Sequence, residues 1–314
     1  MKSIITEELR ARQKACEYAI KHKNNAEAAR RYHTSRQQIS RWVSRYDGTI
    51  DSLRPKSRRP KHHPSQHTED ELKLLKRMYS SYGFEGLAQV YVEACKRGYK
   101  RSYGSMCKQI RMRYHSLIEK VSKPRSKWKP DKVTYPGEKV QIDLKYVPKE
   151  CLKFDTKGIS YYQITALDEY SRKRVLKIVD EKSVTHTSQF LLTLETEMGF
   201  SIKTVQTDNG SEFTNTVGNK LSLFEKTLVR LGIKYKKTRP YSPWQNGKVE
   251  RSHKIDGEHF YQREFYSLEA LLKAHKRYCS RYNNIARRVL NFKSPNEIVK
   301  EYLANQSGPC VTNV

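Results

Sequence analysis

The sequence has few acidic residues for its length and little apolar content. It holds 33 Asp and Glu against 62 Lys and Arg, a formal net charge of +29, and only 36% of its 314 residues are hydrophobic. The mean hydropathy is −0.87, and no apolar stretch approaches the roughly 18 residues needed to span a bilayer. The amino terminus also lacks the apolar segment of a secretory signal. These absences argue against a membrane-spanning chain and predict a soluble, cytoplasmic protein.

Cysteine patterns that bind metal or form disulfide scaffolds are missing as well. The six cysteines include no CxxC pair and show none of the dense spacing of a secreted scaffold. We therefore expect reduced thiols. His62 and His63 stand side by side, but no cysteine or third histidine follows at zinc spacing, which favours a solvated linker over a metal site.

The excess of basic residues points to a polyanionic partner, and nucleic acid is the leading candidate. The charge is uneven, because residues 1–135 hold 32 Lys and Arg against 13 Asp and Glu, a net charge of +19. The first part of the chain is thus expected to be the stronger DNA clamp. Composition alone leaves open a ribosomal-type or membrane-surface basic protein, so motifs must decide.

Residues 1–50 are interpreted as a helix-turn-helix DNA-binding domain. Residues 6–46 show three short helical patterns, and a T-x-x-Q capping box from Thr34 to Gln37 is expected to start the third. Side chains early and outward on that helix are suited to reading base edges in a major groove. The alternative is a plain helical bundle with a solvated charged face. The candidate DNA-reading residues are Arg36, Gln37, Gln38 and Arg41.

A basic linker and a second helical module follow. Residues 51–67 are rich in Pro, Arg, Lys and His, and we expect this linker to track phosphates through Arg58 and Arg59. Residues 68–117 open with a T-x-x-E box at Thr68 and are interpreted as a second helix-turn-helix module. Its outward Lys108 and Arg111 are candidate DNA contacts, although an ordinary basic surface is an equal alternative.

A second basic linker, residues 118–135, precedes a change to β-rich patterning. Residues 136–265 give the order β-β-β-α-β-α-β-α, which predicts a mixed α/β sheet. Residues 266–304 add two helices, the last opened by a capping box at Ser294, and residues 305–314 are expected to be a disordered tail. The fold class is therefore an α/β core with a mixed sheet, preceded by two all-α modules.

Three acidic residues in this region carry the chemistry. Asp143 stands in a strand, VQID; Asp208 follows a β-branched strand in QTDNGSEF; and Glu250 lies in YSPWQNGKVERSH, where Ser242, Pro243 and Gln245 form a helix-start signature that would put Glu250 about two turns into a helix. Taken singly, each has an ordinary alternative: a surface Asp in an edge strand, an Asp-Asn-Gly turn, or a surface charge on a basic helix.

Together the three acids suit phosphodiester chemistry. Cutting or transferring a phosphodiester requires charge neutralisation, which two Mg²⁺ or Mn²⁺ ions held by carboxylates provide. Clustered carboxylates without metal repel one another and raise their own pKa values. We therefore expect Asp143, Asp208 and Glu250 to be both catalytic residues and metal ligands, in a site that is unformed or mobile without metal.

These motifs, in this order, resemble the D, D, E signature of bacterial insertion-sequence transposases related to retroviral integrases. The likeness extends to ALDEYSR at residues 166–172, to RYNN at residues 281–284 and to the helical front. It implies an RNase H-like mixed-sheet core in a bacterial, nucleoid-associated enzyme. It also implies a chain that binds the terminal inverted repeats of a mobile element, frees 3′ hydroxyl ends with water and joins them to target DNA as at least a homodimer.

The resemblance has departures. Between Asp208 and Glu250 lie 41 residues rather than the family's usual 35 or so, and the excess is expected in a longer loop at residues 215–222. Many relatives carry Lys or Arg seven positions after the Glu, where this chain has Gly257, and Lys254 is expected to take over that DNA contact. The remaining residues expected to hold DNA near the cut are Gln245, Asn246, Lys248 and Arg251.

Three other functions are alternatives to a transposase. A helix-turn-helix repressor or decayed transposase would not need an intact acidic triad. A nuclease acting on RNA-DNA hybrids would not need two sequence-reading modules. The 21 tyrosines suggest a tyrosine recombinase, but no Arg and His set accompanies them.

Overall fold

The computed structural model describes residues 6–55, 65–114, 132–215, 220–239 and 242–306. The chain divides into two compact units, residues 1–67 and 68–314. Arg58, Arg59, His62 and His63 lie outside the described residues, as do most of the second linker and of the expected tail. In the described ranges no helix is both long and apolar enough to cross a membrane, and the five cysteines found there are free.

The first unit contains the three expected helices, α1 (Glu7–His22), α2 (Asn25–Arg31) and α3 (Arg36–Val43), and a 3₁₀ turn, η1 (Ile50–Leu53). Ala15, Ala28 and Ile39 are fully buried where the helices meet. The expected cap at Thr34 is wrong by one residue, because the Ser35 side chain accepts the hydrogen bond from Gln38 N. The helix ends at Val43, before the expected Tyr46.

The second unit begins with three helices, α4 (Glu69–Tyr82), α5 (Leu87–Lys96) and α6 (Tyr103–Tyr114), with a 3₁₀ turn, η2 (Gly83–Glu85), after α4. The expected capping box is confirmed, since the Thr68 side chain accepts from Glu71 N while the Glu71 carboxylate accepts from Thr68 N. The three helices share a core that includes Leu75, Val90, Met106 and Ile110.

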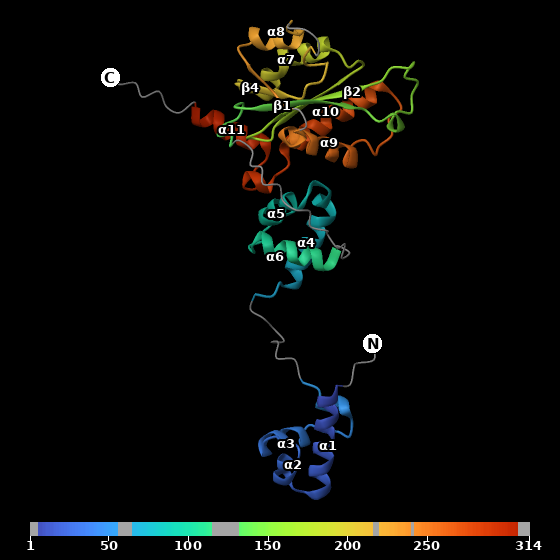
Figure 1. Cartoon of the computed structure of the whole chain (residues 1–314), viewed down its shortest axis with the longest axis vertical. Coiled ribbons are helices and arrows are strands. Elements are labelled where there is room, and N and C mark those ends of the chain that lie inside the picture. Colours follow the sequence, from blue (N-terminus) through green and yellow to red (C-terminus); the bar gives the residue numbers. More distant parts are fainter. Residues whose placement is uncertain (1–5, 56–64, 115–131, 216–219, 240–241, 307–314) are drawn as a thin grey trace, which may run out of the picture. The chain divides into compact units, whose positions relative to one another are not determined.

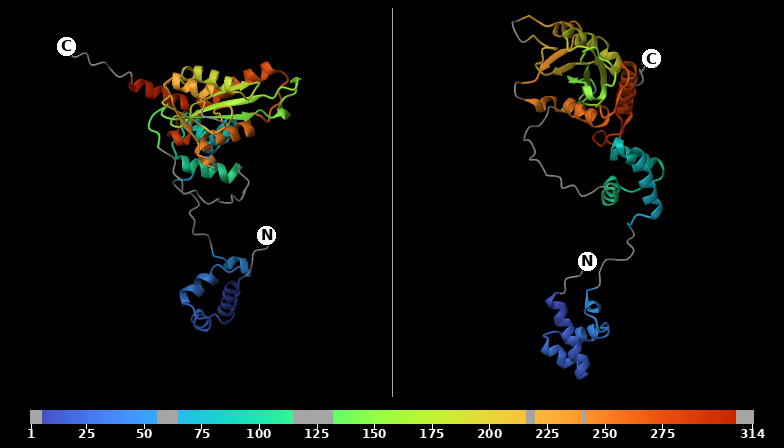
Figure 2. Two further views of the ribbon diagram at one scale, coloured as in Figure 1. Left: turned by 45° about the horizontal axis from the view of Figure 1, so that its top comes forward. Right: turned by 90° about the vertical axis from the view of Figure 1, so that its right-hand side faces the viewer.

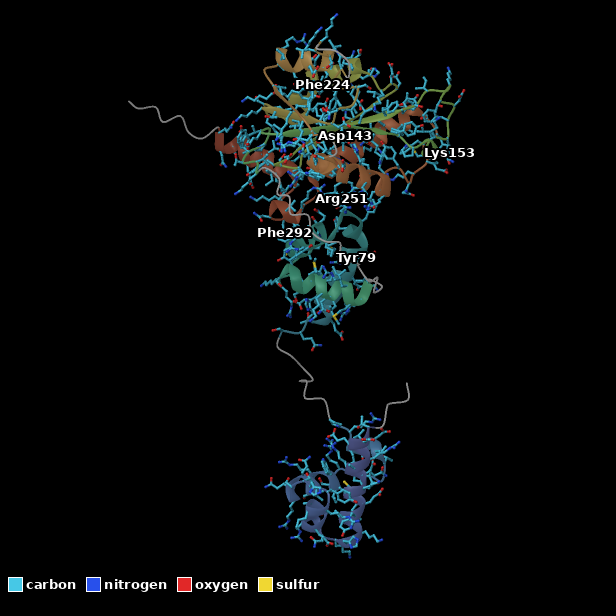
Figure 3. The ribbon with its side chains drawn as sticks, in the orientation of Figure 1. Tyr79, Asp143, Lys153, Phe224, Arg251 and Phe292 are labelled. Carbon is cyan, nitrogen blue, oxygen red and sulfur yellow. The ribbon has the colours of Figure 1, made fainter. Side chains whose placement is uncertain are left out.

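This helical module packs against the segment between helix α10 (Leu268–Asn284) and helix α11 (Pro295–Gln306). The Phe292 ring lies 5.0 Å from the Tyr91 ring and 5.1 Å from the Tyr103 ring, and Ala286 N donates to Gln89 Oε1 at 2.8 Å. Figure 3 labels Phe292 beside the helical module. These contacts join helices α5 and α6 to a segment about 200 residues later in the chain.

The sheet has five strands in the order β3-β2-β1-β4-β5. They are β1 (Val140–Tyr146), β2 (Tyr162–Asp168), β3 (Arg174–Val179), β4 (Thr204–Thr207) and β5 (Lys234–Lys237). Strands β1, β2 and β3 are antiparallel neighbours, while β4 is parallel to both β1 and β5. This mixed sheet confirms the expected RNase H-like α/β core.

Helices cover both faces of the sheet (Figures 1 and 2). Helices α7 (Val184–Met198) and α8 (Leu223–Arg230) lie on one face, and α9 (Gly247–His259) and α10 (Leu268–Asn284) lie on the other. The main core, between the sheet and helices α7 and α8, includes Ile142, Ile164, Phe190, Val205 and Phe224. The chain then passes through η5 (Arg288–Leu290) to α11 (Pro295–Gln306), where Ser294 and Glu297 form the expected capping box.

Candidate active site

Asp143 lies in the central strand, which rules out the edge-strand alternative for this residue. Val140 and Ile142 are fully buried in the main core, so alternation turns Asp143 to the opposite face, toward helix α9. Its Oδ1 accepts a hydrogen bond from Leu144 N at 2.9 Å, and its Oδ2 lies 3.4 Å from His253 Nδ1 of helix α9. Figure 3 labels Asp143 on the sheet.

Asp208 follows strand β4 directly, at the carboxyl end of a strand that runs parallel to β1. The register pairs Gln141 with Gln206, each two residues before its aspartate. Because parallel strands in register keep equivalent residues side by side, Asp143 of strand β1 and Asp208 come next to each other at the point where strand β4 ends. The Asp208 Oδ1 accepts from Gly210 N at 3.0 Å, which fixes the turn after the strand.

Glu250 lies in the first turn of helix α9, not two turns in. Residues Pro243–Asn246 form a 3₁₀ turn, η4, and the α-helix starts only at Gly247. A carboxylate in the first turn faces the positive end of the helix dipole. The Glu250 side chain is exposed, so a metal ion or a substrate could reach it.

The three carboxylates act on one another electrostatically. Burial raises the pKa of Asp143 to about 7, and the negative charge of Asp208 adds to the shift, with smaller contributions from Glu250 and Glu212. Burial also raises the pKa of Glu250, again with a contribution from Asp208. The arrangement therefore favours a bound cation over three free negative charges.

The donor chemistry fits a hard divalent cation, because all three candidate ligands offer carboxylate oxygens. Within the described ranges, no group of three His, Cys, Asp or Glu side chains is already gathered closely enough to hold a metal ion. The exposed Glu250 is the ligand that would have to adjust. Asp143, Asp208 and Glu250 would hold the ion or ions between strands β1 and β4 and the start of helix α9.

Helix α9 is fastened to the sheet by a buried ion pair that the motifs did not indicate. Arg174 Nη1 of strand β3 lies 2.7 Å from Asp256 Oδ1, and both side chains are fully buried. Burial acts to lower the pKa of Arg174, yet the Asp256 carboxylate holds it above its ordinary value. The Arg174 guanidinium also stacks 3.6 Å from the Tyr282 ring centre, and Asp256 accepts from Tyr278 at 2.9 Å.

His253 is a further site residue missing from the sequence prediction. Its Nδ1 faces Asp143, and its Nε2 lies 3.0 Å from Thr165 Oγ1 of strand β2. Burial lowers the pKa of His253 to about 4, so the imidazole is neutral at physiological pH. Its position three residues after Glu250, on the same side of a helix, is the signal that could have identified it.

The expected DNA contacts near the cut fall into two groups. Arg251 and Lys254 are exposed on helix α9. Lys248 instead forms an ion pair with the buried Glu169, and Asn246 is 4% exposed and accepts a hydrogen bond from Gln206. The Gln245 side chain is half-buried and accepts from Arg239 N at 3.0 Å.

The helical modules present their candidate residues at the surface. On helix α3, Arg36, Gln37 and Arg41 are exposed and Gln38 is half-buried; on helix α6, Lys108 and Arg111 are exposed. At position 257, an added Cβ would lie 3.4 Å from Lys145 Nζ. The space next to Gly257 is therefore taken by a lysine from strand β1, whose Nζ donates to His253 O at 2.7 Å.

Parts of the chain are similar to known protein families. Residues 133–243 match an integrase core domain model, residues 231–287 match a second model with the same description, and residues 11–61 match a helix-turn-helix domain. The chain is 30% identical over 102 residues to the "Retrovirus-related Pol polyprotein from transposon TNT 1-94" of Nicotiana tabacum. That match covers 32% of this chain and 7% of the polyprotein.

A solved simian T-cell lymphotropic virus intasome, in complex with the PP2A regulatory subunit B56 gamma, also matches, with a TM-score of 0.43 and 16% identity. The match covers 76% of this chain and 77% of that chain. Integrase core domains are in general polynucleotidyl transferases that depend on divalent metal. Residues 133–287 of this chain are thus similar to integrase core domains, and residues 11–61, ahead of that region, are similar to a helix-turn-helix domain.

Proposed function

We propose that this protein is a DDE transposase. It binds the terminal inverted repeats of a mobile element, cleaves DNA strands with water and transfers the resulting 3′ hydroxyl ends into target DNA. The observation that carries the proposal is electrostatic: burial raises the pKa of Asp143 and of Glu250, and the negative charge of Asp208 adds to both shifts, so carboxylates from three separate motifs act on one another.

The three carboxylates have different supports in the fold. Asp143 and Asp208 are held by hydrogen bonds from Leu144 N and Gly210 N, so their carboxylates keep fixed orientations. Glu250 approaches from helix α9. Two Mg²⁺ or Mn²⁺ ions bound by these carboxylates would neutralise charge on the phosphate and activate the attacking oxygen.

DNA is proposed to reach this site along basic surfaces of the second unit. Arg251, next to Glu250, lines a cavity of about 430 Å³ together with Arg263 and Arg277. Guanidinium groups bind phosphates through paired hydrogen bonds. Arg251 and Lys254 would therefore hold the DNA backbone next to the cleaved bond, with Lys248 and Gln245 at the border of the site.

Sequence reading is proposed for the helical modules. Arg36, Gln37 and Arg41 on helix α3 would contact bases of the inverted repeat, and Gln38 would support them. Lys108 and Arg111 on helix α6 would add contacts from the second module. Because transposition joins two element ends, the active species is proposed to be a homodimer or a higher homo-oligomer on DNA.

The test uses an oligonucleotide that carries one end of the element, identified as a short inverted repeat in the DNA flanking the gene. Asp208→Asn should abolish Mg²⁺-dependent 3′ end cleavage and strand transfer while end binding, measured by fluorescence anisotropy, stays within about twofold. Asp180→Asn, at an exposed carboxylate, is the matched control and should retain both. Strand transfer by Asp208→Asn at the wild-type rate would overturn the assignment.

A further inference from the structure

Two buried glutamines occupy equivalent positions in the first two acidic motifs. Gln141 stands two residues before Asp143, and Gln206 stands two residues before Asp208. The register of the parallel strands β1 and β4 pairs these glutamines directly. Their side chains are buried, 1% and 2% exposed, although an uncharged amide gains nothing from burial unless its hydrogen bonds are made.

Both amides make their hydrogen bonds to the start of helix α9. Gln141 Nε2 and Gln206 Nε2 each donate to the main-chain oxygen of Gln245 at 2.9 Å. Gln206 Nε2 also donates to Asn246 Oδ1 at 2.9 Å. Glutamines from the two strands that carry the proposed catalytic aspartates therefore bind the same main-chain carbonyl, that of Gln245, five residues before Glu250.

Gln141 also caps helix α9. Asn246, at the N-cap position, makes no side-chain capping bond, so the first N–H groups of the helix need other acceptors. Gln141 Oε1 accepts from Val249 N at 3.1 Å. A side chain from the central strand thus does what an N-cap residue ordinarily does, and the capped N–H belongs to the residue just before Glu250.

The orientation of the Gln141 amide is fixed by its partners. Its Nε2 donates a second hydrogen bond to Glu169 Oε1 at 2.8 Å, and Glu169 is itself paired with Lys139 and Lys248. Burial acts to raise the pKa of Glu169, but the hydrogen bonds from the two lysines hold it below its ordinary value. A flipped amide would face its NH₂ group toward Val249 N–H and its oxygen toward a carboxylate, so only one orientation satisfies all partners.

We propose that Gln141 and Gln206 are positioning residues that set the location of Glu250 relative to Asp143 and Asp208. Each glutamine belongs to the same strand as one aspartate and bonds to the segment that leads into Glu250. The hydrogen bonds of the two glutamines therefore fix the start of helix α9, and with it Glu250, relative to strands β1 and β4. The inference rests on the proposed triad, and it makes the glutamine in each of VQID and QTDNG part of the site.

The experiment compares Gln141→Met and Gln206→Met with the wild type, because methionine keeps the length of the side chain and removes both donor and acceptor. Loss of an outer-shell partner typically costs 10- to 100-fold in metal affinity or activity. We expect at least about a tenfold weaker Mn²⁺ affinity, measured on the whole protein by electron paramagnetic resonance, and a matching rise in the metal concentration for half-maximal strand transfer. Binding of element-end DNA should stay within about twofold.

Gln163→Met is the matched control. Gln163 is also a fully buried strand glutamine; its amide nitrogen donates to Thr165 and to Asp256 in the last turns of helix α9, and its amide oxygen bonds to Tyr261 and His275, so none of its partners lies at the start of that helix. It should lower the stability to urea like the other two variants and leave Mn²⁺ affinity unchanged. If all three variants lose stability alike and none changes Mn²⁺ affinity, the glutamines are structural and the inference is wrong.

A folding failure would not leave the question open. Asn246→Ala removes one acceptor of Gln206 and leaves the carbonyl bond in place, so it should fold and still weaken Mn²⁺ binding. Unchanged Mn²⁺ affinity in this variant would count against the inference. The binding measurement also separates this inference from the proposed function: a wild-type protein that binds Mn²⁺ through the triad but transfers no DNA would contradict the function and leave the positioning result readable.

Discussion

Removal of the Asp143 carboxylate should stabilise the metal-free protein at neutral and higher pH. Burial and the charge of Asp208 raise the pKa of Asp143 from an ordinary 3.8 to about 7. The folded state therefore binds a proton that the unfolded chain has already released between about pH 4 and pH 7. The free energy of unfolding consequently falls as the pH rises through this window and is lowest above pH 7, where the buried group is ionised.

The size of the effect follows from the pKa difference. At 1.36 kcal/mol for each pKa unit, an ionised Asp143 costs at most about 4 kcal/mol at pH 8 and almost nothing at pH 4. Asn is nearly the same shape, and its side-chain oxygen still accepts from Leu144 N, which donates to the aspartate at 2.9 Å. Asp143→Asn should thus remove the charge and keep the packing.

The assay is urea unfolding followed by circular dichroism in EDTA, at pH 5 and pH 8. We expect Asp143→Asn to exceed the wild type in stability by roughly 2–4 kcal/mol at pH 8, and by clearly less at pH 5. Added Mn²⁺ should reverse the order, because only the wild type keeps all three ligands. A stability difference that is the same at both pH values, or is absent, would refute the reasoning.

Two other substitutions test how the core is held together. Asp256→Ala leaves the guanidinium of Arg174, fully buried, without its charge partner, and urea unfolding should show a loss of about 3–5 kcal/mol; a loss under 1 kcal/mol would mean that the pair does not fasten helix α9. Gly137→Ala should cost about 1–3 kcal/mol, because Gly137 has φ +84° and an added Cβ would lie 2.1 Å from Ser201 O. Gly232→Ala is the control, with φ +69° and open space; equal losses would show that backbone conformation alone, without the clash, sets the cost.

Local sequence patterns predicted the start of a helix correctly where only one residue could serve as the N-cap. Thr68 with Glu71, and Ser294 with Glu297, each have a single reading as a capping box, and both form. At the third helix the sequence offers two hydroxyl residues in succession, Thr34 and Ser35, and each has a glutamine three positions later. Local pattern cannot choose between them, and the structure uses Ser35.

Local sequence pattern also failed to predict where helix α9 starts, and this error misplaced Glu250 within the helix. Ser242, Pro243 and Gln245 do resemble a helix start, but Pro243–Asn246 close a 3₁₀ turn and the α-helix begins at Gly247. Just before this start, the Gln245 carbonyl accepts hydrogen bonds from glutamines of strands β1 and β4, which lie 104 and 39 residues earlier in the chain. Helix periodicity contains no information about such partners.

The three carboxylates are predicted from the motifs because the chemistry of phosphodiester transfer demands acids, whatever holds them in place. The residues that hold them have no such chemical signature: a glutamine in a strand is an ordinary polar residue until strand register places it opposite another. Gln141 and Gln206 become meaningful only once β1 and β4 are known to be parallel neighbours. Short motifs thus indicate the chemistry of the site, whereas its geometry depends on strand pairing across the sheet. Glu250 depends on both: a motif predicts its role, and hydrogen bonds from strands β1 and β4 to the segment before it set its position.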